Sequence, residues 1–170
     1  MNPSEPQSLS SPARDAPFVR RVALACATTF GVGYAPFAPG TFGSAAGLIL
    51  WWMLPGSAGV QAAVIVAIFI VGSWSGTIAE RHFGTSDPSA VVIDEVMGML
   101  ITLFLNPVGW KGAVAAFFLF RAADVIKPFP ANRLERLHGG VGVMADDGMA
   151  AIYANLALRA CAAIWHLIIR

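Results

Sequence analysis

Acidic residues placed inside long apolar runs constrain this chain more than any other feature of its sequence. Five of its ten acidic residues fall in three short blocks: Asp94-Glu95, Asp124 and Asp146-Asp147. An ionised carboxylate is costly to remove from water unless it is paired, hydrogen-bonded or bound to a cation. Because 56% of the residues are hydrophobic and only 12% are charged, these acids require a specific explanation.

The composition is typical of a membrane protein, or of a small helical protein that consists almost entirely of core. An average soluble domain has about 25% charged residues, and the mean hydropathy here is +0.66. The net charge of +1 provides no broad basic surface for nucleic acid. Cys26 and Cys161 stand in apolar runs without a CxxC pattern, as buried thiols in a reducing compartment do.

Breaks at proline and glycine divide the chain into a tail and about six helices. Residues 1–17, rich in Ser and Pro, are expected to form a disordered cytoplasmic tail before a single helical domain over 18–170. The 22 residues at 58–79 carry no charge and are long enough for a bilayer span. Poor alternation argues against strands. Other helices are expected at 43–54, 89–105 with Ser89 as N-cap, about 111–126, and from near Asp146 to the end. The predicted fold class is therefore all-α: a single bundle, membrane-embedded or membrane-associated.

Small residues in two of these helices are expected to allow close helix packing. Gly43, Ala46 and Gly47 recur in one apolar helix, and Gly72 and Gly76 in the next. Such spacing lets helix backbones approach each other. Glycines tolerated in a membrane helix would give the same pattern.

Two glycine-containing segments are candidates for binding an oxyanion. Residues 36–44 place Thr41 and Ser44 where either could cap a helix, whose free N–H groups attract anions. An ordinary capped loop explains this segment alone at least as well. Gly139, Gly140 and Gly142 could present backbone N–H groups to an oxyanion just before Asp146-Asp147.

Two blocks in predicted helices carry the other charged candidates for the site. Asp94 and Glu95 point about 100° apart on a helix, so one could bind a metal while the other orients water; a solvated helix start is the alternative. Arg121, Asp124 and Lys127 recur at i, i+3 and i+6. They could grip phosphate, or form a salt-bridged helix end at a membrane boundary.

The donor set favours Mg²⁺ over other cofactors. Several carboxylates suit a hard cation that keeps waters and also binds substrate phosphate. His138 has no partner histidine at zinc-type spacing. No glycine loop is followed by a Walker lysine, so use of a nucleoside triphosphate is not indicated.

Taken in order, the four blocks resemble the signature of the phosphatidylglycerophosphatase A family. The matching motifs are Pro-x-x-Pro-Gly-Thr-x-Gly-Ser at 36–44, Val-Val-Ile-Asp-Glu-x-x-Gly at 91–98, Arg-x-x-Asp-x-x-Lys-Pro-x-Pro at 121–130 and His-Gly-Gly-x-Gly-x-Met-x-Asp-Asp at 138–147. The resemblance implies a Mg²⁺-dependent enzyme of the bacterial cytoplasmic membrane that hydrolyses phosphatidylglycerophosphate to phosphatidylglycerol. Its active site would face the cytoplasm, with the acyl chains of the substrate remaining in the leaflet.

Each block then receives an expected role. Arg121 and Lys127 neutralise the terminal phosphate, and Asp124 is either a metal ligand or a brace for Arg121. Thr41, Ser44 and the backbone of Gly139, Gly140 and Gly142 donate hydrogen bonds to the phosphate. The expected ligands of one or two Mg²⁺ ions are Asp94, Glu95, Asp146 and Asp147. Attack by water and an aspartyl-phosphate intermediate both remain open.

Three alternatives to this function remain. The chain could be a phosphatase for another lipid phosphate, since the residues do not specify the headgroup. It could also be a transporter with buried ion-pairing acids, or a scaffold without catalysis. The oligomeric state cannot be read from the sequence.

Overall fold

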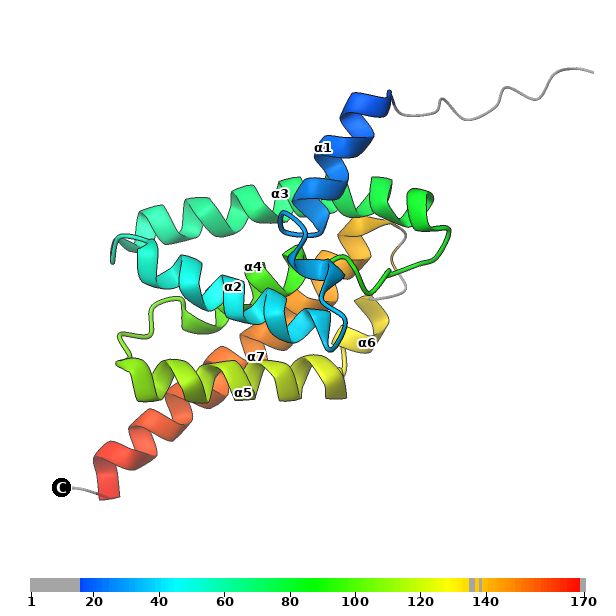
Figure 1. Cartoon of the computed structure of the whole chain (residues 1–170). Coiled ribbons are helices and arrows are strands. Elements are labelled where there is room, and N and C mark those ends of the chain that lie inside the picture. The colour runs from blue at the N-terminus through cyan, green and yellow to red at the C-terminus, as the bar shows by residue number, and fades with distance from the viewer. Residues whose placement is uncertain (1–15, 135–136, 138, 169–170) are drawn as a thin grey trace, which may run out of the picture.

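The protein is an all-helical bundle throughout the residues that the structure describes. A computed structural model describes residues 16–134, 137 and 139–168, so most of the predicted tail lies outside the described residues. Within these ranges the predicted bundle of about six helices without strands is confirmed, because six α-helices have 11 or more residues. The elements are α1 (Pro17–Ala27), the 3-10 helix η1 (Val32–Tyr34), α2 (Pro39–Met53), α3 (Ala58–Phe83), α4 (Ile93–Leu103), α5 (Trp110–Ile126), the four-residue α6 (Ala131–Leu134) and α7 (Gly140–Ile168) (Figure 1).

Helix α4 is the central element of the bundle. Helices α2, α3, α5 and α7 all pack against it (Figure 1), and nine of its eleven residues are buried. A helix enclosed in this way has no face on which a charged side chain reaches bulk water. The two acids in its first turn, Asp94 and Glu95, must therefore find their partners inside the protein.

Small residues permit the close packing of the helices, as predicted for Gly47 and Gly76. A Cβ atom on Gly47 of α2 would lie 2.8 Å from the Cβ of Met99 on α4. One on Gly76 of α3 would lie 3.0 Å from the Cα of Gly140 on α7. Any side chain at these positions would push the helices apart.

Helix α4 begins later than the sequence predicts. It starts at Ile93 rather than after Ser89, and its N-cap residue, Val92, makes no side-chain capping bond. The N–H of Val92 instead donates to the carbonyl oxygen of Ala27 at 2.9 Å. This long-range bond holds the preceding segment against the end of α1, so the helix cannot extend backwards.

Helix α7 begins earlier than the sequence predicts. It starts at Gly140 instead of near Asp146, so residues 140–142, predicted as a loop, are helical. A Cβ atom on Gly140 would overlap the carbonyl oxygen of Ser73 on α3. Gly140 is therefore needed for the close contact between α7 and α3, and it is not part of a loop.

The outer surface of the bundle is apolar. Helix α3 and residues Gly140–Trp165 of α7 are each long and apolar enough to cross a membrane. Only 28% and 22% of their most apolar stretches, respectively, are buried in the protein. Large side chains such as Trp52 of α2 and Phe118 of α5 are also exposed. A soluble protein covers helices of this kind in its core. The exposed surface therefore favours a membrane-embedded bundle.

The two ends of the bundle differ in charge. The N-termini of α2, α4 and α7 meet the C-termini of α3 and α5 at one end, on the right in Figure 1. This end, which carries Asp94, Arg121 and Asp147, is referred to below as the polar end. The opposite end carries Lys111 at the start of α5 and Arg159 of α7.

At the opposite end, α7 provides partners for the last carbonyl groups of α4. The Nδ2 atom of Asn155 lies 2.9, 3.0 and 2.9 Å from the carbonyl oxygens of Ile101, Thr102 and Phe104. The Nη2 atom of Arg159 donates to Phe104 at 3.3 Å. Carbonyl groups at a helix C-terminus have no partner within their own helix. Asn155 and Arg159 therefore allow α4 to end inside the bundle.

Candidate metal and phosphate site

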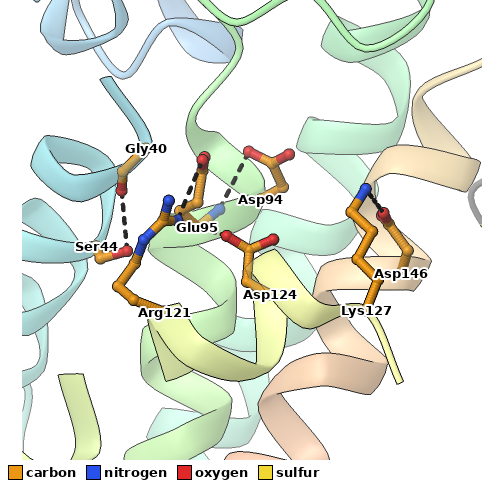
Figure 2. Close-up of polar contacts among 8 residues, drawn as sticks. All are labelled: Gly40, Ser44, Asp94, Glu95, Arg121, Asp124, Lys127 and Asp146. Carbon is orange, nitrogen blue, oxygen red and sulfur yellow. Dashed lines mark hydrogen bonds and ion pairs between the residues drawn. The ribbon is translucent and has the colours of Figure 1, made fainter. Parts of the chain in front are cut away.

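Three carboxylates from two helices converge at the polar end. One oxygen from each of Asp94 and Glu95 on α4 and Asp147 on α7 lies within 4.8 Å of the other two. Oxygens bound to one ion lie no further apart than twice the metal–oxygen distance, about 4–5 Å for Mg²⁺ or Ca²⁺. Figure 2 shows Asp94 and Glu95 side by side, with Asp124 facing them from α5. The arrangement can hold a divalent cation.

Burial excludes the interpretation of Asp94-Glu95 as a solvated helix start. Asp94 is only 5% exposed. Desolvation raises the pKa of Asp94 well above its ordinary value of 3.8, and the charges of Glu95 and Asp147 raise it further. Desolvation also raises the pKa of Glu95, although a hydrogen bond with Asp94 and the charge of Arg121 act in the opposite direction. Such a cluster favours the binding of a cation.

Several carboxylate oxygens at this site have no protein partner. Glu95 Oε2, Asp146 Oδ1 and Asp147 Oδ2 are buried and make no hydrogen bond among the described residues. A buried acceptor without a partner is rare and destabilising. A bound cation would satisfy such oxygens, so the side chains present fit a metal ion.

Arg121 of α5 connects acids of two helices, α4 and α5. Its Nη1 atom lies 3.6 Å from Glu95 Oε1 and 2.6 Å from Asp124 Oδ2. Of the two roles predicted for Asp124, this geometry favours the one in which it orients Arg121.

Asp146 and Lys127 form a separate ion pair beside the carboxylate cluster. Lys127 Nζ lies 2.7 Å from Asp146 Oδ2 (Figure 2), and Asp146 is 3% exposed. Asp146 is not among the three residues whose oxygens converge within 4.8 Å. Its role as a metal ligand, and that of Lys127 in binding phosphate, remain predictions.

The first turn of α2 lies directly against Glu95 and Arg121. A Cβ atom on Gly40 would overlap Glu95 Oε1 and would lie 3.0 Å from Arg121 Nη1. The absence of a side chain at Gly40 therefore makes room for the charged groups. This contact brings the N-terminal N–H groups of α2 to the edge of the site, where the positive end of the helix dipole favours an anion.

The predicted capping of α2 by Thr41 or Ser44 is not present. The N-cap residue of α2 is Ala38, with no side-chain capping bond. The hydroxyl of Ser44 is buried and donates to the carbonyl oxygen of Gly40 at 2.9 Å (Figure 2). Hydrogen bonds from Thr41 and Ser44 to a phosphate stay predictions.

The glycines at 139–142 pack against α3 and the segment before α7. The N–H of Gly140 donates to the hydroxyl of Thr77 at 2.9 Å, and the N–H of Gly142 donates to Gly139 at 2.9 Å. The predicted hydrogen bonds from Gly139, Gly140 and Gly142 to phosphate stay a prediction. Sequence reasoning missed Thr77, whose only signal is a hydroxyl in an apolar run next to Gly76.

Comparison with known proteins places these residues in a family. A profile described as phosphatidylglycerophosphatase A matches residues 25–162, a stretch that contains all the acidic residues of the site. The chain belongs to the phosphatidylglycerophosphatase A family. The family predicted from the four motifs is confirmed, and with it the expected enzyme class, a phosphoric monoester hydrolase.

Relatives of the phosphatidylglycerophosphatase A family cover most of the chain. Phosphatidylglycerophosphatase A of Haemophilus influenzae is 39% identical over 138 residues, 79% of this chain and 85% of that protein. The protein of the same name from Escherichia coli is 34% identical over 129 residues, 74% of this chain and 75% of that protein. A protein of Bacteroides thetaiotaomicron, named as a candidate phosphatidylinositol-3-phosphatase, is 40% identical over 137 residues, 75% of this chain and 85% of that protein. No solved structure matches the chain.

Proposed function

We propose that this chain hydrolyses the terminal phosphate monoester of phosphatidylglycerophosphate, with Mg²⁺ as cofactor, and releases phosphatidylglycerol and inorganic phosphate. The observation that carries the proposal is the convergence of three carboxylates, two buried and one half-buried, beside Arg121, with unpartnered oxygens on two of them. The relatives named phosphatidylglycerophosphatase A supply the choice of substrate. The product phosphatidylglycerol makes this a step of glycerophospholipid biosynthesis.

The metal would be held by Asp94, Glu95 and Asp147. These residues offer only oxygen donors, which a hard cation such as Mg²⁺ prefers. Bound Mg²⁺ would neutralise charge on the phosphate and lower the pKa of a bound water. The three side chains contribute by bringing their oxygens to within 4.8 Å of one another before any ligand arrives.

Arg121 is the principal phosphate-binding residue of the proposal. A guanidinium can donate two parallel hydrogen bonds to phosphate oxygens, and its ion pair with Asp124 fixes its orientation. Lys127 adds a second positive charge at the end of the same helix. The N-terminus of α2, with Thr41 and Ser44, would complete the phosphate pocket. Gly140 and Gly142 would join it by exchanging their bonds to Thr77 and Gly139 for bonds to phosphate.

Two chemical routes fit the unpartnered oxygen Asp147 Oδ2. In the first, a carboxylate accepts a proton from water as the water oxygen attacks phosphorus in line, and the lipid alcohol leaves. In the second, a carboxylate oxygen attacks phosphorus, the lipid alcohol leaves with a proton, and water then hydrolyses the aspartyl phosphate. Trapping of a phosphorylated protein with hydroxylamine distinguishes the two.

We place the enzyme in the bacterial inner membrane with its polar end facing the cytoplasm. Cytoplasmic ends of membrane helices carry an excess of Lys and Arg. Arg81, Lys127 and Arg133 lie at the polar end, whereas Lys111 and Arg159 lie at or near the other. This orientation would put the phosphate site at the headgroup level of the cytoplasmic leaflet.

Phosphate release from a panel of lipids tests the proposal. Purified protein in mixed micelles receives phosphatidylglycerophosphate, phosphatidate or phosphatidylinositol 3-phosphate, with Mg²⁺ or with EDTA. Fastest release from phosphatidylglycerophosphate, abolished by EDTA and by Asp94→Asn, is expected. Glu80→Gln, at the end of α3 and outside the carboxylate cluster, is the matched control and should keep activity. Release that survives EDTA would exclude the metal role, and solute flux through liposomes without any phosphate release would indicate a transporter.

A second candidate is a phosphatase for phosphatidylinositol 3-phosphate. It is favoured by the relative from Bacteroides thetaiotaomicron, whose name gives that substrate and whose identity to this chain is 40%. The side chains described above all address the phosphate monoester, which both lipids share. The same panel therefore decides between the two headgroups.

A further inference from the structure

An apolar groove runs between α3 and α7, the two helices able to cross a membrane. Its volume is about 390 Å³, within the range of small-molecule sites. Val66 and Phe69 of α3 form one wall, and Met149 and Ile152 of α7 form the other. Val66, Phe69 and Ile152 are exposed. The groove therefore opens onto the apolar outer surface of the bundle.

The floor of the groove continues the face of α4 that carries Asp94. Met97 and Ile101 form this floor. At 100° and 1.5 Å per residue, they lie about 60° and 20° from the direction of Asp94, and about 5 and 11 Å further along the axis. On α7, Gly148 lines the groove immediately after Asp147. The groove thus begins roughly one helical turn below the carboxylates.

Methionine is frequent in the lining of this groove. Met97, Met144 and Met149 contribute three of the protein's six methionines. An unbranched thioether side chain adapts its shape to the ligand and is common on surfaces that bind flexible apolar molecules. Among the residues that the structure describes, none that lines the groove is charged. These properties suit a hydrocarbon chain better than a polar headgroup or a peptide.

We propose that this groove holds one acyl chain of the phospholipid whose phosphate is hydrolysed at the polar end. The proposal rests on the proposed function, because one lipid must occupy the groove and the carboxylate site together. Both walls belong to the candidate membrane spans, so the groove is continuous with the surface that faces hydrocarbon. An acyl chain in it would fix the lateral position and the depth of the phosphate relative to Asp94 and Asp147.

A second apolar hollow fits this role less well. It lies between α3 and the end of α1, has a volume of about 350 Å³, and has Ile93 and Val96 as its α4 residues. These point about 100° and 160° away from Asp94 on the helix. A lipid in that hollow would have to pass around α4 to reach the carboxylates.

A pair of tryptophan substitutions on α3 tests the groove. Val66→Trp should fill it, whereas Ile70→Trp adds the same side chain one turn away, at a position that is 62% exposed and outside the groove. For the long-chain lipid, Val66→Trp should raise KM about tenfold, the effect of losing one or two methylene contacts, with kcat unchanged. Hydrolysis of the deacylated, water-soluble analogue should be unaffected. Ile70→Trp should change neither.

The same comparison on α7 gives an independent measurement. Ile152→Trp should reproduce the KM effect, and Leu156→Trp, also exposed and outside the groove, should not. Equal KM values for a groove variant and its control would overturn the proposal. So would a change in the oligomeric state of Val66→Trp in detergent with KM unchanged, which would make the groove a protein interface.

Photolabelling separates this inference from the proposed function. A phospholipid with a diazirine near the end of one acyl chain is added to the EDTA-treated protein, and labelled peptides are located by mass spectrometry. Labels concentrated on 65–69 and 149–152 are expected, and labels spread evenly over the lipid-facing helices would contradict the groove. Wild-type protein that releases phosphate from no lipid would refute the proposed function, while the labelling pattern still decides where acyl chains bind.

Discussion

Replacement of Asp147 by asparagine should abolish activity and at the same time stabilise the metal-free protein. The amide of asparagine and the carboxylate of aspartate have nearly the same size, so packing is preserved. Asp147 lies within 4.8 Å of Asp94 and Glu95 at the ligand oxygens. With an effective dielectric constant of 20, each fully charged pair at that distance costs about 3.5 kcal/mol.

Protonation limits this repulsion, because burial and the neighbouring acids raise the pKa of Asp94. The net gain from Asp147→Asn is therefore about 1–3 kcal/mol, since a partly protonated cluster retains only part of the repulsion. At about 2–4 °C per kcal/mol for a chain of this size, Tm should rise by roughly 2–12 °C.

Thermal unfolding in detergent, with EDTA and then with Mg²⁺, measures both parts of this prediction. Wild-type protein should gain stability from Mg²⁺, whereas Asp147→Asn should start higher in EDTA and gain little. Glu80→Gln removes a carboxylate at the end of α3 that is outside the cluster and should leave both responses as in the wild type. A variant that is less stable than wild type in EDTA, yet gains as much from Mg²⁺, would refute the repulsive metal cluster.

Three further predictions follow from the geometry. Gly40→Ala should lower kcat at least about tenfold while the protein remains folded, because the new methyl group displaces Glu95 and misplaced catalytic groups lose such factors; Gly59→Ala, at an open helical position, is the control. Burial raises the pKa of Asp94 above 3.8, so the folded protein binds this proton more tightly than the unfolded chain does. The Tm of the metal-free protein should therefore fall as pH rises through the raised pKa, and Mg²⁺ should suppress the fall. Asn155→Ala should cost about 1–3 kcal/mol in the free energy of unfolding, because it removes the hydrogen bonds from Asn155 to carbonyl oxygens at the end of α4.

The sequence allowed prediction of the site wherever chemistry forces residues together. Acids in apolar runs need partners, so Asp94, Glu95 and Asp147 could be expected to converge, and the structure brings their oxygens to within 4.8 Å. The all-helical bundle followed from long apolar segments separated by proline and glycine. These features depend on local composition and on the cost of burying charge, both of which are readable along the chain.

Features decided by long-range contacts could not be predicted. Residues 140–142 have the composition of a loop, but contact with α3 makes them helical. Asp146 and Asp147 are neighbours with the same side chain, yet one pairs with Lys127 and the other joins the carboxylate cluster. Which face of α7 turns towards α4 decides this difference, and the sequence alone does not specify that rotation.

The bonds from Asn155 and Arg159 to the end of α4 have a consequence for the carboxylates at the other end. Asp147 and Asn155 stand eight residues apart on one continuous helix, about 12 Å. Because α4 and α7 are bonded to each other at one end, they cannot slide along each other at the polar end. The bonds at this end of α4 therefore help to fix the spacing between Asp94 and Asp147. Breaking them should make the relative positions of the carboxylate oxygens less precise, although no carboxylate is changed.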